Sequence, residues 1–351
     1  MIERKLKGYL QKINPKILGF NQPLEIKNIL RLASGESNLN YQVLVNKQTF
    51  LIRLSMTPSQ PRKLAKEFEI LLLLKDLRIA PKPYHYENSS EEVGVEFSIL
   101  EFLEGENLHG DNSKIFCSKD VKGGIIPELA KLVAILHSVN IPAAMRNRLR
   151  GVNPYAATFW GAYRKRIMYL MNKWEEYRIS NELTSFLQET VEKARDVKIH
   201  FRSDLVLGHG DIAPQNVLLH KGKLFLIDWE DARLLDPAQD LVILFDSFDL
   251  SLEQQKSFLE VYLNLRSDDS LQKRILALWP WQVFGTFLWA IGHVFEIGDR
   301  ELHVELVQQQ DLAHHIEYTE KTFRKCTEAA LIPKKIEWNV EKLFPELFIL
   351  S

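Results

Sequence analysis

The sequence predicts an α+β protein of two lobes, with strands in its N-terminal part and helices in most of the remainder. The chain has 351 residues, more than one hydrophobic core usually organises, which favours two lobes. Apolar and polar residues alternate over Tyr41–Val45 and again over Phe50–Leu54, the period of half-buried strands. After residue 103, most apolar residues recur at helical spacing instead.

Composition and charge narrow the class of protein. Hydrophobic residues make up 46% and charged residues 26% of the chain, as in soluble globular proteins. The net charge of −1 predicts no nucleic-acid surface. Cys117 and Cys326 lie far apart, so we expect neither a disulfide framework nor a zinc site. Because no signal peptide is recognisable and the most apolar stretch, Ile275–Ile297, is interrupted by polar residues, we expect a cytoplasmic protein without a membrane span.

The N-terminal part reads as an extension followed by a small sheet. Residues 1–24 predict a helix and a loop without chemistry, and Leu24–Leu32 predicts the first strand. The loop Ser34–Asn38 follows, and such a loop can present backbone N–H groups to phosphates, although its single glycine also fits an ordinary turn. A helix is expected at Arg62–Leu77 and a further strand at Val95–Leu103.

A β-hairpin organises the centre of the chain. Its two apolar runs, Val217–Leu219 and Leu224–Ile227, are separated by Lys221-Gly222. The hairpin should return Asp228 to the neighbourhood of Asp211 and Asn216. One carboxylate could then face a hydroxyl, while an amide oxygen and a second carboxylate are the hard ligands that Mg²⁺ shares with phosphates.

The segments HGDIAPQN, LIDWEDA and DPAQDL resemble the aminoglycoside phosphotransferase and choline kinase family, small-molecule kinases with a protein-kinase-like fold. The resemblance implies a small antiparallel-sheet lobe over residues 1–103, with 1–24 as an extension, and a larger, mainly helical lobe over residues 104–351. It implies ATP or GTP as co-substrate and Mg²⁺ as cofactor. The implied roles are catalytic base for Asp211, metal ligands for Asn216 and Asp228, and structural support for His209 and Asp240.

The same resemblance implies the nucleotide site. Phosphates would lie under a Gly/Ser/Asn loop and beside an arginine that replaces the usual strand lysine. That arginine would pair with a helix carboxylate, for which the family pattern favours Glu67 over Glu69. The purine would meet main-chain groups of the last strand. The residues implied are Gly35, Ser37, Asn38, Arg53, Glu67, Glu101 and Leu103. Glu36 departs from the pattern because a carboxylate beside a triphosphate is repulsive.

The C-terminal part predicts a series of helices and, less directly, an acceptor site. Helices are expected from Pro127, at 156–177, 181–197, 237–245, 270–297 and 299–329, and after a Ser251 cap. Glu230 and Asp231 would suit a cationic acceptor, such as an amino sugar or amino alcohol; a role in balancing Arg233 or the metal stays open. The apolar stretch Ile275–Ile297 contains Trp279, Trp281 and Trp289, which we expect in the core. The alternative is that they form an aromatic wall for a quaternary ammonium group.

These patterns together predict a Mg-dependent kinase that phosphorylates a hydroxyl of a small molecule. Eleven residues separate Asp228 from Asp240, which leaves no room for the activation segment of a protein kinase. A nucleotide-binding pseudokinase or scaffold is the main alternative, and a metal-dependent hydrolase explains fewer residues. The acceptor, the choice between ATP and GTP, and the oligomeric state stay open.

Overall fold

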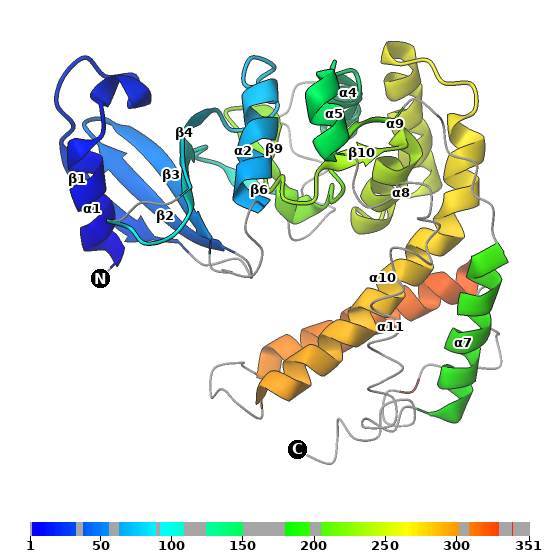
Figure 1. Cartoon of the computed structure of the whole chain (residues 1–351). Coiled ribbons are helices and arrows are strands. Elements are labelled where there is room, and N and C mark those ends of the chain that lie inside the picture. The colour runs from blue at the N-terminus through cyan, green and yellow to red at the C-terminus, as the bar shows by residue number, and fades with distance from the viewer. Residues whose placement is uncertain are drawn as a thin grey trace. The chain divides into compact units, whose positions relative to one another are not determined.

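A computed structural model gives the fold of the chain (Figure 1). The residues that it describes are 2–32, 38–55, 63–88, 92–108, 124–149, 180–196, 205–301, 309–329 and 339. The chain divides into two compact units, each made of several segments. The first unit comprises Met1–Leu149, Val206–Leu235 and Ser247–Ser267, and the second comprises the remaining residues. The two lobes expected from the sequence, divided at residue 103, do not correspond to these two units, and the boundary at residue 103 stays a prediction.

A five-stranded antiparallel sheet forms the N-terminal part of the first unit, in the order β1-β2-β3-β5-β4. Its strands are β1 (Ile26–Arg31), β2 (Asn38–Val45), β3 (Gln48–Ser55), β4 (Pro83–Glu87) and β5 (Phe97–Glu101). The strands expected from alternation are therefore all present. Because side chains alternate between the two faces, Phe50, Ile52 and Leu54 share one face of β3 while Arg53 lies on the other.

The N-terminal extension covers the apolar face of this sheet. It forms the helix α1 (Ile2–Lys12) and a 3-10 turn, η1 (Pro15–Leu18), whose buried leucines pack against the sheet core. The predicted helix is confirmed, and its role is to bury that face. Helix α2 (Lys63–Leu74) contacts β4 and β5, and Arg53 extends to it from the face of β3 that points away from the core.

Two small sheets in the first unit carry the central loops. One contains β6, β8 and β9, and the other pairs β7 with β10. The bounds are β6 (Glu106–Asn107), β7 (Val206–Gly208), η2 (Pro214–Asn216), β8 (Val217–His220), β9 (Lys223–Leu226) and β10 (Arg233–Leu235). The predicted hairpin is β8–β9, and Lys221 and Gly222 both have positive φ, 49° and 75°, as a tight hairpin turn requires.

Three helices complete the first unit: α4 (Ile125–His137), α5 (Ala143–Leu149) and α9 (Leu252–Leu265). Helix α4 begins two residues before Pro127, after Gly124. The capping box expected at Ser251 is present, because the Ser251 side chain accepts from the Gln254 N–H and the Gln254 side chain accepts in return. Helix α4 packs on α9, where buried His137 hydrogen-bonds to the Tyr262 hydroxyl at 2.8 Å.

The second unit is helical among its described residues. Its helices are α7 (Asn181–Asp196), α8 (Pro237–Ser247), α10 (Leu271–Glu301) and α11 (Gln309–Glu328). Buried ion pairs hold them: Arg274 at the start of α10 binds Asp236 and Asp268, each at 2.9 Å, and Lys325 of α11 binds Asp246 of α8 at 2.8 Å. The helix expected at 156–177 and Cys117 lie outside the described residues.

Helix α10 is less buried than its composition predicts. The Leu276 side chain is 74% exposed and the Trp289 side chain 46%, while Trp279 and Trp281 are half-buried. The expectation that all three tryptophans belong to the core is therefore wrong for Trp289. By length and composition, Leu271–Val294 could also cross a membrane, but 61% of its apolar window is buried, as in core helices of soluble proteins.

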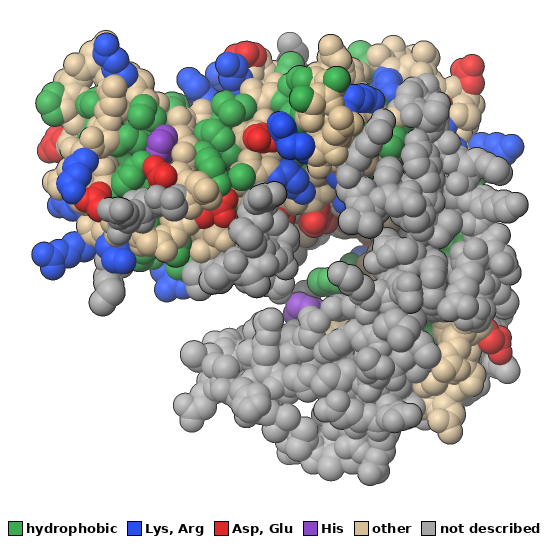
Figure 2. Space-filling model, in the orientation of Figure 1, with side chains coloured by type: hydrophobic (Ala, Val, Ile, Leu, Met, Phe, Trp, Pro, Cys, Tyr) green, Lys and Arg blue, Asp and Glu red, His purple; other side chains and the backbone are tan. Residues whose placement is uncertain are grey.

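The molecular surface carries both signs of charge. On the face drawn in Figure 2, Lys and Arg side chains are interspersed with Asp and Glu side chains across the coloured residues. This distribution agrees with the near-zero net charge of the whole chain.

We predict that Gly105→Ala destabilises the protein and Gly8→Ala does not. A Cβ on Gly105 would lie 2.2 Å from the Leu219 carbonyl oxygen, whereas no atom lies within 4 Å of a Cβ on Gly8 in α1. Overpacking of this kind costs about 1–3 kcal/mol, and alanine favours a helix over glycine by about 0.5–1 kcal/mol. Denaturant unfolding of both variants measures the difference, and equal stability of the two would contradict the close approach at Gly105.

Candidate active site

A short loop after β7 carries His209, Gly210 and Asp211. Gly210 has φ +81°, and a Cβ there would meet the Asp231 carbonyl oxygen at 2.6 Å and the Arg233 guanidinium at 2.4 Å. Glycine is therefore required where this loop passes the segment before β10. The His209 ring is fully buried, hydrogen-bonds to the Ile227 carbonyl at 3.0 Å and lies 4.7 Å from the Trp229 ring. These contacts fit the structural role expected for His209.

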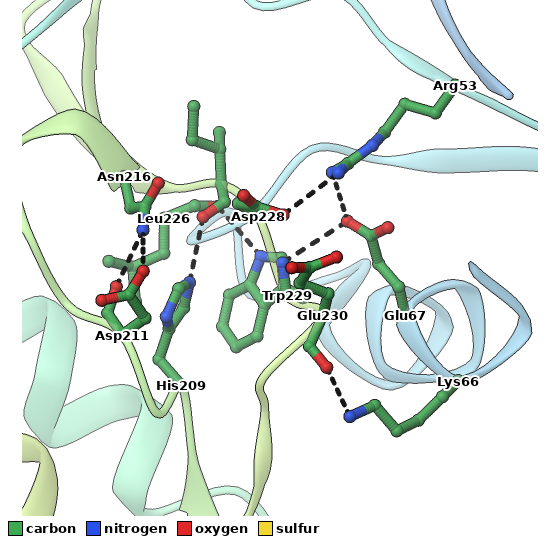
Figure 3. A network of polar contacts seen from close by, with 11 residues as sticks. Arg53, Lys66, Glu67, His209, Asp211, Asn216, Leu226, Asp228, Trp229 and Glu230 are labelled. Atoms are coloured by element: carbon green, nitrogen blue, oxygen red, sulfur yellow. Dashed lines mark hydrogen bonds and ion pairs between the residues drawn. The ribbon is translucent and has the colours of Figure 1, made fainter. Parts of the chain in front are cut away.

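Asp211 and Asn216 are joined by their side chains. Asn216 Nδ2 donates to Asp211 Oδ2 at 2.8 Å and to the Asp211 carbonyl at 3.0 Å (Figure 3). The amide nitrogen is thereby committed to Asp211, and Asn216 Oδ1 faces away from it. An amide held in this way presents an oxygen ligand on its other side.

The hairpin returns Asp228 beside Asn216. The Ile227 N–H donates to the Asn216 carbonyl at 3.0 Å, and Asp228 is the next residue in the chain after Ile227. Asp228 has φ 66°, a left-handed conformation that Asp tolerates better than most residues, and 41% of its side chain is exposed. The three residues predicted from spacing thus come together, with Asn216 directly before the hairpin and Asp228 shortly after it.

Arg53 bridges two carboxylates. One terminal nitrogen donates to Glu67 Oε1 at 2.6 Å and the other to Asp228 Oδ1 at 3.0 Å (Figure 3). The carboxylate that pairs with the strand cation is thus Glu67, which is 2% exposed, whereas Glu69 pairs with Arg148 at 3.0 Å on the surface. The pair couples β3, α2 and the loop after β9.

Two residues that the sequence did not single out tie α2 to the same loop. The Trp229 N–H donates to Glu67 Oε1 at 3.4 Å, and Lys66 Nζ donates to the Glu230 carbonyl at 2.5 Å. Trp229 is fully buried, and its indole N–H donates to the Leu226 carbonyl at 3.0 Å. The sequence signal for Lys66 is only its position next to Glu67, and the signal for Trp229 is its place directly after Asp228.

The electrostatics of the cluster follow from burial and from crowding of like charges. Burial raises the pKa of the Asp211 carboxyl, as do the charges of Asp231 and Asp228, whereas His209 and the Asn216 hydrogen bond oppose the shift. Burial also raises the pKa of the Glu67 carboxyl, against the opposing effect of Arg53. Like charges therefore crowd around Asp211 and Glu67, and a bound cation would relieve their repulsion.

An apolar surface adjoins the last strand of the large sheet. Leu103, Leu218 and Phe225 form a buried cluster against which Ile227 packs. Leu218 and Phe225 are directly paired across the hairpin, so alternation within β8 and β9 is the sequence signal for them. At the end of β5 itself, the Glu101 N–H donates to the Lys82 carbonyl at 2.7 Å.

The remaining predicted site residues fall in several places. Gly35, Glu36 and Ser37 lie outside the described residues, and Asn38 begins β2. Glu230 and Asp231 follow Trp229; Glu230 is half-buried and Asp231 exposed, and Arg233 donates to the Asp231 carbonyl at 3.0 Å. Asp240 lies fully buried in the first turn of α8, in the second unit, and its support of the loop stays a prediction.

Comparison with known proteins identifies the family. A family model described as the phosphotransferase enzyme family matches residues 28–275. The chain belongs to this family. Protein LicA of Haemophilus influenzae is 41% identical over 56 residues, which are 16% of this chain and 21% of LicA. The chain thus matches about a fifth of that relative's length. The family confirms the prediction of a phosphotransferase.

Solved structures confirm the kinase-like α+β fold. A spectinomycin phosphotransferase in complex with ADP and spectinomycin has a TM-score of 0.58 at 13% identity, covering 88% of this chain and 95% of that chain. A Plasmodium vivax ethanolamine kinase also has a TM-score of 0.58, at 18% identity, covering 91% of this chain and 84% of that chain.

We predict unequal costs for removing the two neighbouring carboxylates of α2. Glu67→Ala leaves the buried Arg53 without this carboxylate, which costs about 3–5 kcal/mol, whereas Glu69→Ala breaks an exposed pair worth less than about 1 kcal/mol. Denaturant unfolding of the two single variants measures both costs. A Glu67→Ala protein as stable as Glu69→Ala would show that Arg53 does not depend on Glu67.

Proposed function

We propose that this phosphotransferase moves the γ-phosphate of ATP or GTP to a hydroxyl of a small molecule, with Mg²⁺ as cofactor. The observation that carries the proposal is the arrangement of Asp211, Asn216 and Asp228. Asn216 is turned by its bond to Asp211 so that its oxygen faces away, and Asp228 follows on the returning strand. A base and two metal ligands gathered at the ends of one hairpin would supply what phosphoryl transfer requires.

The donor set fits a magnesium ion. Asn216 Oδ1 and the Asp228 carboxylate are hard oxygen ligands, and Asp228 is exposed enough to bind a ligand from solution. Two protein ligands suit an ion whose other positions are filled by phosphate oxygens and water. When bound, Mg²⁺ neutralises charge on the transferred phosphate. The part of this chain is to hold both ligands in register, through the Ile227–Asn216 bond and the Arg53–Asp228 pair.

The nucleotide contacts come from four parts of the chain. We assign the phosphates to Arg53 and to the loop residues Gly35, Ser37 and Asn38. We assign the purine to the main chain of Glu101 and Leu103, beside the apolar cluster of Leu103, Leu218, Phe225 and Ile227. That cluster offers the flat apolar contact that a purine ring needs. The ADP bound by the spectinomycin enzyme supports a nucleotide co-substrate.

Asp211 acts on the acceptor. Its Oδ2 accepts from Asn216, and we assign the other oxygen, Oδ1, to the acceptor hydroxyl, which it orients and whose proton it accepts. Burial is compatible with this role, because it raises the pKa of the Asp211 carboxyl and makes the carboxylate more basic.

The acceptor that fits best is cationic. Asp211, Asp228 and Asp231 interact as like charges, and Glu230 adjoins them, so a protonated amine on the acceptor would lower the repulsion. This favours an amino alcohol or an amino sugar, in a cytoplasmic enzyme. An ethanolamine kinase and a spectinomycin phosphotransferase among the similar structures support the same two classes. A pseudokinase that binds nucleotide without transfer is the alternative.

We predict phosphate transfer to one class in a panel of choline, ethanolamine, aminoglycosides, thiamine, homoserine and sugars. ADP and GDP release would be followed in a coupled assay with Mg²⁺. Asp211→Asn keeps the size of the side chain but removes its basicity, so turnover should fall by about 10²–10⁴-fold with little change in nucleotide affinity. Nucleotide binding without transfer to any acceptor would favour the pseudokinase, and full activity of Asp211→Asn would refute the assignment of the base.

We predict that Asp228→Ala weakens binding of the Mg-nucleotide by at least about ten-fold, the effect of about 1.4 kcal/mol. The reason is the loss of one of two protein ligands. Calorimetric titration with and without EDTA separates this loss from a general defect. The difference between the variant and the wild type should vanish when the metal is removed, and an equal loss under both conditions would contradict the metal role.

A further inference from the structure

Lys66 makes a contact that the proposed chemistry does not use. It lies in α2 directly before Glu67, and its ammonium group donates to the main-chain carbonyl of Glu230 at 2.5 Å (Figure 3). The side chain is half-buried. Because the hydrogen bond is accepted by the main-chain carbonyl of Glu230, it restrains the backbone of the loop whatever side chain residue 230 carries.

The contact belongs to a two-point attachment of the loop to α2. Glu67 accepts from the N–H of Trp229, and Lys66 donates to the carbonyl of the next residue, Glu230. Adjacent helix residues project about 100° apart, so the two side chains hold the loop from different directions. One such bond would leave the loop free to turn about it; two bonds at consecutive residues restrict that rotation.

Asp228 needs this restraint more than an ordinary residue does. Its φ of 66° is a left-handed conformation, and a non-glycine residue stays there only where its surroundings determine it. On the following side, the buried Trp229 ring is held by the Leu226 carbonyl and by His209. The Lys66–Glu230 bond extends this hold one residue further along the main chain.

We propose that Lys66 is a positioning residue: by binding the Glu230 carbonyl it holds the loop after β9, and with it the Asp228 carboxylate, in place for the Mg-nucleotide. The proposal rests on the proposed function, since it gives Asp228 the role of metal ligand. Lys66 itself touches neither phosphate nor acceptor in this assignment. Its effect on the reaction passes through the backbone of residues 228–230.

The test compares Lys66→Met, which keeps the aliphatic stem and removes the donor, with Lys66→Arg, which keeps a cationic donor. Lys75→Met is the matched control, because Lys75 is exposed just after the end of α2 and its removal costs the same charge. Two quantities are measured: hydrogen exchange of the backbone amides of residues 226–232 without nucleotide, and KM for the Mg-nucleotide together with kcat.

We expect Lys66→Met to speed exchange in this segment and to raise KM for the Mg-nucleotide, each by about ten-fold, because a hydrogen bond from a charged donor is lost. The value of kcat at saturating Mg-nucleotide should change much less. Lys66→Arg should behave much like the wild type in both measurements, because it keeps a cationic donor. Lys75→Met should show neither the faster exchange nor the raised KM. A merely structural contact would lower the melting temperature without separating KM from kcat.

Other outcomes overturn the proposal. Unchanged exchange in Lys66→Met would mean that the bond does not hold the loop, and faster exchange with normal KM would mean that the loop does not position Asp228. A change in KM for the acceptor alone would place Lys66 at the acceptor. Failure of the proposed function is distinguishable, because it would show first as a wild-type protein that binds no Mg-nucleotide.

Discussion

The buried guanidinium of Arg53 is the constraint on which the rest of the site depends. A cation taken out of water must be compensated by nearby carboxylates, or its desolvation would outweigh the gain from folding. Glu67 and Asp228 supply that compensation at 2.6 and 3.0 Å, and they come from a helix and a loop that are far from β3 in sequence. Because each carboxylate binds a different nitrogen of the same guanidinium, Arg53 links the strand, the helix and the loop. The same carboxylates raise the pKa of Arg53, against the lowering effect of burial, so the guanidinium stays charged.

Main-chain contacts turn this charge balance into a defined geometry. Ion pairs are weakly directional, but the loop after β9 is also bound at its backbone, by Glu67 at the Trp229 N–H and by Lys66 at the Glu230 carbonyl. On the other side, the Ile227 N–H binds Asn216. The left-handed Asp228 therefore lies between fixed neighbours on both sides, which is the condition under which a strained backbone conformation persists.

Local patterns predicted the parts of this site that are formed locally. Alternation and a Lys-Gly turn were enough to predict β8–β9, and a hairpin of known register brings Asn216 and Asp228 together without further information. The fold and the roles of Arg53 and Glu67 came instead from resemblance to a family, because their pairing spans elements that no local pattern connects. The roles assigned to individual site residues stay predictions.

Long-range contacts without a sequence signature account for what the sequence did not reveal. Nothing in the sequence connects Lys66 with the loop that carries Glu230, although the two are hydrogen-bonded. Residues 1–24 read as an extension without a role, although their leucines bury one face of the sheet. Conversely, the apolar composition of 270–297 predicts more burial than α10 has, because composition does not say which residues its neighbours cover, and Trp289 is half exposed.

The geometry of the site also explains why residue 53 is an arginine in place of the usual strand lysine. Lysine carries a compact charge on one nitrogen and would have to share it between Glu67 and Asp228. Arginine has two terminal nitrogens held in one plane, and in this site each serves a different carboxylate. The exchange of lysine for arginine therefore preserves the link from strand to helix and adds a direct link to Asp228. A departure that could suggest a degenerate site instead ties the loop that carries Asp228 more closely to the sheet.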